Sequence, residues 1–113
     1  MKDLKALYII VNAGFSSEVV DIAREVGSTG ATILNARGSV ANPRTILGIT
    51  IDTEKEIVVS VVEKEIAIRI MEAVKEKAGV GTAAHGLCFY MPVDMSTLQY
   101  RETMGADESL SER

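Results

Sequence analysis

Two strand–helix–strand patterns follow one another in this chain, and they limit its possible folds more than any other feature. The first runs from an apolar, β-rich segment at residues 4–11 through a helical pattern to a strand at 31–37. The second starts at residues 57–62, continues through a helical pattern, and closes with a strand at 87–93. We expect 113 residues with two such units to form one domain, in which both helices pack on one face of a single sheet.

The predicted fold class is α+β, a ferredoxin-like split β-α-β sandwich of order βαββαβ with a four-stranded antiparallel sheet. Segments 46–52 and 57–62 are either one long strand bent at residues 52–56 or two shorter strands, and the sequence leaves both alternatives open. Segment 4–11 is expected in the centre of the sheet. Pro92 favours an edge position for the last strand, because proline cannot donate a ladder hydrogen bond.

Each predicted helix has one apolar stripe and ends at a glycine. The first helix begins at Ser16 or Ser17, either of which is a suitable N-cap, and ends at Gly27. The second spans about residues 65–78 and ends at Gly79. The residues predicted to face the core are Val19, Ile22, Ala23 and Val26 in the first helix, and Ile66, Ile70, Ala73 and Val74 in the second.

Two helices can cover only one face of the sheet, yet the strand at 57–62 has apolar residues on both faces. Ile57, Val59 and Val61 alternate there with Val58, Ser60 and Val62. An exposed apolar sheet face marks an interaction surface. The sequence therefore predicts that copies of the chain cover each other in a homotrimer, with a ligand site between subunits.

Charge and composition argue against several classes of protein. The net charge is −4, and residues 102–113 alone contribute −3, so the nearly neutral remainder lacks the basic stripe of a nucleic-acid-binding protein. We expect a domain at 1–101 and an acidic, disordered tail at 102–113. The apolar runs are too short to cross a bilayer, no signal peptide is recognisable, and the lone Cys88 suits a reducing compartment, so a cytoplasmic location is expected.

A glycine-rich segment at residues 79–86, the glycine loop, precedes the last strand. It fits G-x-G-x-x-A, but dinucleotide and phosphate-binding motifs need a strand before and a helix after, and here the order is reversed. The loop is either a plain turn or a nest of N–H groups that binds an anion. His85 and Cys88 point to different faces around a strand entry, so we expect neither a catalytic pair nor a metal site from them.

Three segments together resemble the divergent, PII-like members of the nitrogen regulatory protein P-II family. They are residues 30–38 (GATILNARG), residues 48–58 (GITIDTEKEIV) and residues 86–93 (GLCFYMPV), and the similarity covers about residues 3–95 in order. The resemblance implies a trimeric, ferredoxin-like signal transducer that is not an enzyme. It implies an adenine nucleotide (AMP, ADP or ATP) bound between subunits, and a mobile T-loop that contacts a metabolic enzyme or a membrane transporter.

Carried over by position, the resemblance implies a set of site residues. Thr32 and Ser60 line the base pocket, and Arg37 and Gly38 form the root of the T-loop at residues 38–47. The phosphate-facing B-loop contains Ala84, His85 and Gly86, and the residues of the T-loop expected to contact a partner are Asn42, Pro43 and Arg44.

The chain departs from the family pattern where phosphate is bound. Leu87 stands where the family has a lysine, only Arg101 lies near the usual pair of C-terminal arginines, and the predicted T-loop contains no tyrosine for uridylylation. Each lost charge-assisted contact is worth about 1.5–3 kcal/mol, so AMP, ADP or another anion is expected to bind better than ATP. Two alternatives stay open: a trimer resembling the CutA divalent-ion tolerance proteins that binds a metal or metabolite, and a small ferredoxin-like enzyme.

Overall fold

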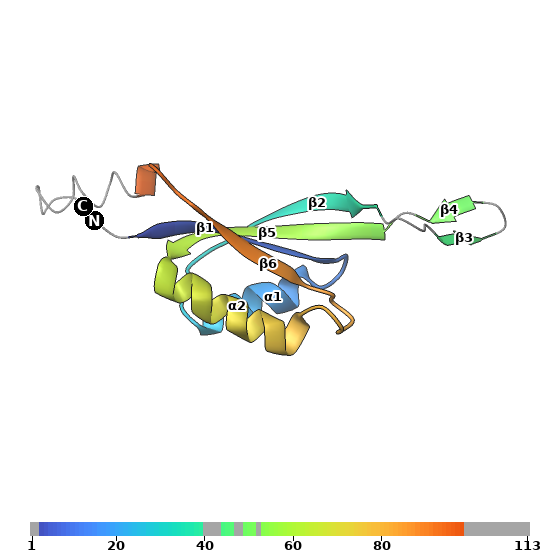
Figure 1. The fold of residues 1–113 in the computed structure, drawn as a ribbon, viewed down its shortest axis with the longest axis horizontal. Coiled ribbons are helices and arrows are strands. Elements are labelled where there is room, and N and C mark those ends of the chain that lie inside the picture. The colour runs from blue at the N-terminus through green and yellow to red at the C-terminus, as the bar shows by residue number, and fades with distance from the viewer. Residues whose placement is uncertain (1–2, 40–43, 47–48, 52, 99–113) are drawn as a thin grey trace, which may run out of the picture.

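The computed structural model describes residues 3–39, 44–46, 49–51 and 53–98. Four long strands form one layer and two helices form a second layer beneath it (Figure 1). In chain order the elements are β1 (Leu4–Asn12), α1 (Ser16–Glu25), β2 (Thr32–Gly38), β3 (Arg44–Ile46), β4 (Ile49–Ile51), β5 (Thr53–Glu63), α2 (Lys64–Ala78) and β6 (Leu87–Pro92).

The main sheet has the order β2-β5-β1-β6, and every neighbouring pair is antiparallel. The ferredoxin-like prediction is therefore confirmed. As the sequence indicated, β1 lies inside the sheet, and β6 lies at an edge and ends at Pro92.

The core fills the space between the sheet and the helices. Alternate residues of β1 (Leu7, Ile9 and Val11) are at most 1% exposed, as period-two alternation requires for the covered face. From the helices, the fully buried side chains are Val19 in α1 and Ala67, Ile70, Val74 and Ala78 in α2. The predicted stripes are thus largely correct; Val26, Ile66 and Ala73 pack only partly buried at the margin.

The N-terminus of α1 differs from the prediction. Neither serine is the N-cap: Phe15 has this position, it makes no side-chain cap, and Ser16 lies inside the first turn. A carboxylate oxygen of Glu56, on β5, instead accepts hydrogen bonds from the backbone N–H groups of Gly14 (3.1 Å) and Ser16 (3.2 Å). A negative charge there satisfies free N–H donors and interacts favourably with the helix dipole.

Glycine ends both helices, for two different reasons. Gly27 has φ +123°, a conformation that disfavours other residues, and the N–H groups of Gly27 and Ser28 bond back to Arg24 and Ala23. Gly79 has an ordinary extended conformation. A Cβ at Gly79 would lie 2.6 Å from the carbonyl oxygen of Lys75, so close packing excludes a side chain there.

The connection between β2 and β5 corrects another expectation. Of the two alternatives for residues 46–62, the structure has two separate strands, but the second begins at Thr53, before the expected residue 57, and it pairs in this region with both β2 and β1. β4 belongs to a separate two-stranded sheet with β3, which lies beyond the end of the main sheet (Figure 1). The connection between β2 and β5 therefore runs from residue 39 to residue 52, beyond the segment 38–47 that the resemblance implies for a T-loop.

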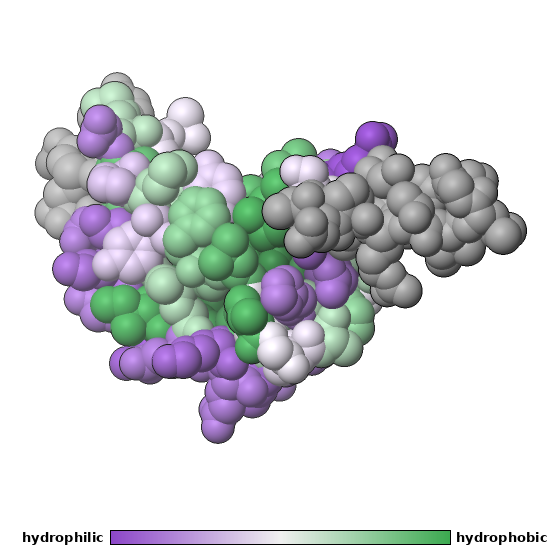
Figure 2. Space-filling model, turned by 45° about the vertical axis from the view of Figure 1, so that its right-hand side comes forward, coloured by the Kyte–Doolittle hydropathy of each residue, from purple (hydrophilic) through white to green (hydrophobic). Residues whose placement is uncertain are grey.

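The face of the sheet away from the helices, called the open face, carries apolar side chains. Tyr8 of β1 stacks on Phe89 of β6 with ring centroids 5.3 Å apart. Around them are exposed residues of β2, β5 and β6, namely Leu34, Val61, Leu87 and Met91, which are 39–53% exposed. Hydrophobic side chains also gather across the middle of the side of the molecule that Figure 2 shows. An apolar surface of this kind needs a partner in water.

Candidate functional site

The polar groups of the site gather at the end of the main sheet from which the β3–β4 hairpin emerges. Lys55 on β5 is in register with Asn12 on β1, and its ammonium donates a 2.8 Å hydrogen bond to the Asn12 Oδ1. The stem of the same lysine lies against Gly38, where a Cβ would come within 3.0 Å of Lys55 Cε. Lys55 therefore connects the last residue of β2 to the last residue of β1.

Asn12 extends these contacts to the glycine loop. Its Nδ2 donates to the Ala83 carbonyl oxygen at 2.9 Å, and its backbone N–H donates to the Ala84 carbonyl oxygen, also at 2.9 Å. The structure thus brings three predicted site residues (Gly38, Ala84 and His85) into one cluster with Asn12 and Lys55. Gly86, the last residue of the loop, anchors it by donating to the Ala78 carbonyl oxygen at 2.8 Å.

A tight turn inside the glycine loop presents unused N–H groups. His85 N–H closes this turn on the Thr82 carbonyl at 3.1 Å, and His85 has φ +51°. The two N–H groups in the middle of the turn, those of Ala83 and Ala84, donate to no acceptor in the described part of the chain; Ala83 is exposed, whereas Ala84 is only 2% exposed. Consecutive free N–H groups next to a residue of positive φ form an anion-binding nest, and the Lys55 charge is close by through Asn12.

Thr32 and Ser60 lie away from this cluster and on opposite faces of the sheet, because Thr32 is in register with the residue next to Ser60. Thr32 pairs with Val59 at the far end of β2, roughly 20 Å along the strand from Gly38. Ser60 is buried; its hydroxyl donates to the Gly30 carbonyl oxygen at 2.7 Å and lies 3.1 Å from the Ser28 hydroxyl. Within one chain, therefore, the two groups of predicted site residues do not meet.

The remaining predicted residues are placed less directly. Arg37 is in register with Glu54. Because side chains alternate along a strand, Arg37 lies on the face of Glu56 and the helices, opposite the face of Lys55. Asn42 and Pro43 lie outside the described residues, and Arg44 begins β3 in register with Ile51.

Lys55 and Asn12 are the residues that the sequence analysis missed. Both fall among ordinary loop-flanking residues, and neither stands at a family phosphate position. Their proximity depends on the β1–β5 register, in which Asn12 pairs with Lys55. Lys55 supplies a cation at the site where Leu87 had suggested there was none.

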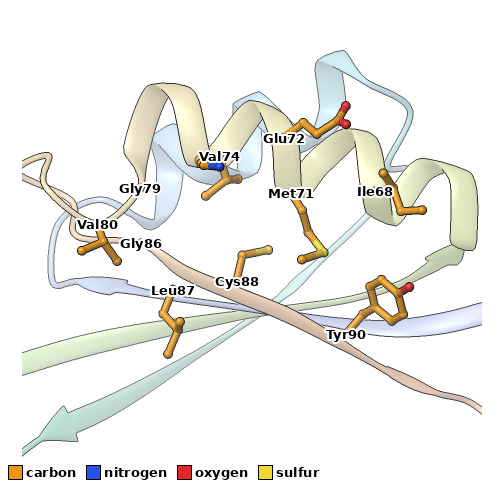
Figure 3. Close-up of a pocket in the computed structure, with 11 residues that line it drawn as sticks. Ile68, Met71, Glu72, Val74, Gly79, Val80, Gly86, Leu87, Cys88 and Tyr90 are labelled. Atoms are coloured by element: carbon orange, nitrogen blue, oxygen red, sulfur yellow. The ribbon is translucent and has the colours of Figure 1, made fainter.

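A separate cavity of about 640 Å³ lies between α2 and β6 and is lined mainly by apolar side chains (Figure 3). Met71 and Cys88 point into it, and Gly79 and Gly86 border it at one end. Burial raises the pKa of the Cys88 thiol to about 12, so this thiol stays protonated at neutral pH. His85 is exposed, and the described residues include no hydrogen bond between it and Cys88, which gives no support to a nucleophile and its base.

Metal binding and membrane insertion find no support in the described residues. No group of three His, Cys, Asp or Glu side chains in this part of the chain is placed to hold a metal ion. Neither α1 nor α2, nor the described turn of helix near residue 97, is long and apolar enough to cross a membrane.

Comparison with known proteins gives the fold a clear set of neighbours, although no protein-family model and no curated protein sequence matches the chain. A Thermus thermophilus protein, named as PII-like and signaling, superposes with a TM-score of 0.64 at 20% identity, over 81% of this chain and 87% of the other. The nitrogen regulatory PII-like protein CPII from Thiomonas intermedia K12, bound to ADP, AMP and bicarbonate, superposes with a TM-score of 0.61 at 19% identity, over 80% of this chain and 89% of CPII. The GlnK–ATP complex of B. subtilis superposes with a TM-score of 0.63 at 16% identity, over 81% of this chain and 84% of GlnK. At these identities the similarity shows that the chain has the fold of PII-like signalling proteins.

Proposed function

We propose that this chain is a divergent PII-like signal transducer, not an enzyme, and that it binds an adenine nucleotide between the subunits of a cytoplasmic homotrimer. The segment from residue 39 to residue 52, between β2 and β5, would then serve as the T-loop that contacts a partner protein, either a metabolic enzyme or a membrane transporter. Asn42, Pro43 and Arg44 are the proposed contact residues.

The observation that carries this proposal is the cluster of Lys55, Asn12 and the glycine loop directly beside Gly38. It combines one positive charge with the free N–H group of the exposed Ala83 and that of the buried Ala84, the kind of donors that a phosphate or carboxylate requires. The cluster also lies where the proposed T-loop begins. An anion bound here would therefore touch the groups that hold the root of this segment.

The arrangement of the other site residues supports a site between subunits. Thr32 and Ser60 lie roughly 20 Å from Gly38 within one chain, so a single chain does not bring the proposed base pocket to the proposed phosphate site. In a closed ring, each site would combine one group from one subunit with the second group from its neighbour. The exposed apolar open face supplies the surface that such a ring would bury.

Isothermal titration calorimetry with ATP, ADP and AMP tests the ligand. With a single lysine in this cluster, the additional phosphate charge of ATP would lack a charge-assisted contact, so we expect ADP or AMP to bind more tightly than ATP. Lys55→Ala should weaken ADP binding about tenfold or more. Lys5→Ala is the matched control, because Lys5 lies at the opposite end of β1 and contacts Asp3 and the Tyr90 ring. Binding of divalent metal alone, with no nucleotide binding, would instead favour the CutA-like alternative.

Light scattering tests the assembly. We expect a mass three times the 12.2 kDa of one chain at micromolar concentration. Phe89→Glu places a charge in the centre of the open face and should give monomers. Ile68→Glu, at an equally exposed apolar residue on α2, should leave the assembly unchanged. A wild-type protein of monomer mass would contradict the proposed trimer.

A further inference from the structure

We infer that Asn12 is a positioning residue that couples the start of β5 to the glycine loop, so that a change at Lys55 alters the loop that carries the proposed phosphate donors. The nature of the ligand rests on the proposed function, whereas the coupling itself can be measured in the ligand-free protein. Three contacts carry the inference: Lys55 to Asn12 at 2.8 Å, Asn12 to Ala83 at 2.9 Å, and Asn12 to Ala84 at 2.9 Å.

The chemistry of the two side-chain contacts fixes the orientation of the Asn12 amide. An ammonium group can only donate and a carbonyl oxygen can only accept. The amide must therefore turn its oxygen to Lys55 and its NH₂ to Ala83, and the flipped orientation would lose both bonds. One amide thus joins a charged side chain on β5 to a backbone carbonyl in the loop.

Neither aspartate nor alanine at residue 12 could make both contacts. Aspartate offers two acceptors, so it would keep Lys55 but could not donate to the Ala83 carbonyl. Alanine would lose both contacts. Asparagine is therefore the short side chain whose donor and acceptor both match this position.

Backbone hydrogen bonds fix residues 12 and 13 to the glycine loop and to β5, so the main chain at Asn12 has little freedom to move. The Asn12 N–H donates to the Ala84 carbonyl at 2.9 Å, and the Ala13 N–H donates to the Glu54 carbonyl at 3.0 Å. Asn12 is thus bonded to the loop and to the start of β5 through main chain as well as side chain. When Lys55 moves toward an anion, the side-chain amide of Asn12 is the group that must respond, and the next group it touches is the Ala83 carbonyl.

A ligand-free NMR experiment tests the coupling. The amide signals of Ala83, Ala84 and His85 are compared between wild type and Lys55→Ala, and again between Asn12→Asp and the double variant. We expect Lys55→Ala to shift these signals in the wild-type background and to leave them unshifted in the Asn12→Asp background. Lys5→Ala, at the other end of β1, should shift none of them.

Two results would overturn the inference. One is an effect of Lys55→Ala that is equally large in the Asn12→Asp background, since the lysine would then act on the loop without Asn12. The other is no effect in wild type. Asn12→Asp is chosen because it preserves shape and the Lys55 contact; circular dichroism confirms its fold before comparison.

Calorimetry with ADP then asks whether the coupling reaches the ligand. Lys55→Ala and Asn12→Ala should each raise the dissociation constant for ADP about tenfold. The double variant should have a dissociation constant no higher than the higher of the two single variants, because the two residues act as one unit. Independent, multiplying effects would contradict the inference. If wild type binds no adenine nucleotide, the proposed function fails, while the NMR result still decides the coupling.

Discussion

Gly86→Ala is expected to destabilise the protein strongly, because no space exists for its methyl group. A Cβ at this position would lie 2.5 Å from the Ala78 carbonyl oxygen and 3.4 Å from Val74 Cγ1. Ala78 is the last residue of α2 and is fully buried. The same oxygen accepts the 2.8 Å hydrogen bond from the Gly86 N–H, so relief of the clash must lengthen that bond.

The expected cost combines two terms. Overpacking against a buried helix end costs about 1–3 kcal/mol, and weakening a buried hydrogen bond costs about 1 kcal/mol. The free energy of unfolding should therefore fall by about 2–4 kcal/mol. Because the substitution also moves the start of β6 away from the end of α2, the glycine loop should shift, and nucleotide binding should weaken with it.

Urea unfolding followed by circular dichroism measures this loss, with wild type and variant at the same protein concentration. Gly30→Ala is the matched control. Nothing lies within 4 Å of a Cβ at Gly30, and its backbone is outside the left-handed region, so its effect should stay within about 0.5 kcal/mol. A Gly86→Ala variant as stable as Gly30→Ala would refute the reasoning from close packing.

Four further predictions concern the core and the titrating groups. Ile70→Ala removes a fully buried side chain and should lower the free energy of unfolding by about 2–5 kcal/mol in the same assay. A loss below about 1 kcal/mol would contradict this expectation, because it would mean that neighbouring side chains fill the cavity. Ser60→Ala removes the 2.7 Å donor of the Gly30 carbonyl, which still accepts from the Ser28 hydroxyl at 3.1 Å, and should therefore cost only about 1 kcal/mol; Ser60→Thr, which keeps the hydroxyl, is the comparison. Burial raises the pKa of the Cys88 thiol from its ordinary 9.0 to about 12, so the contribution of the neutral thiol to folding stability is complete below pH 9 and is lost as the pH rises toward 12. Iodoacetamide at about pH 8 should therefore label Cys88 in urea but barely in the folded protein. Hydrogen bonds from Ser16 and from the Gly14 N–H lower the pKa of Glu56, so the contribution of this carboxylate to folding stability is present above pH 4.5 and is lost as the pH falls through the lowered pKa. Glu56→Gln should flatten the fall in unfolding free energy at acid pH, and an unchanged pH profile would contradict the role of Glu56 as the cap of α1.

The elements that could be predicted from the sequence are those governed by local pattern. The continuous apolar, β-rich run at residues 4–11 and the stripes of both helices identified the sheet, the helices and most of the core. Pro92 and the two terminal glycines marked ends correctly. Short-range rules sufficed because each of these features depends on residues within about one turn or a few strand positions.

The features that could not be predicted depend on register between distant residues. Glu56 caps α1 from β5, 40 positions away, so no local capping pattern signals it. Lys55 meets Asn12 across 43 positions, and only the β1–β5 pairing places them together. The predicted strand at residues 46–52 contains β4, but β3 and its pairing with β4 were missed, because β3 has only three residues and lies where the sequence suggested a loop. The nucleotide site and the trimer remain predictions.

The missing local cap on α1 also bears on the order in which the chain folds. A helix of 10 residues with no cap of its own is marginal in isolation, because few hydrogen bonds repay its nucleation. Its first N–H groups find their acceptor only when β5 has docked beside β1. A peptide of residues 1–38 should therefore show little helix in water, and α1 should form after the central strand pair, so that the slow search for long-range pairing precedes helix formation.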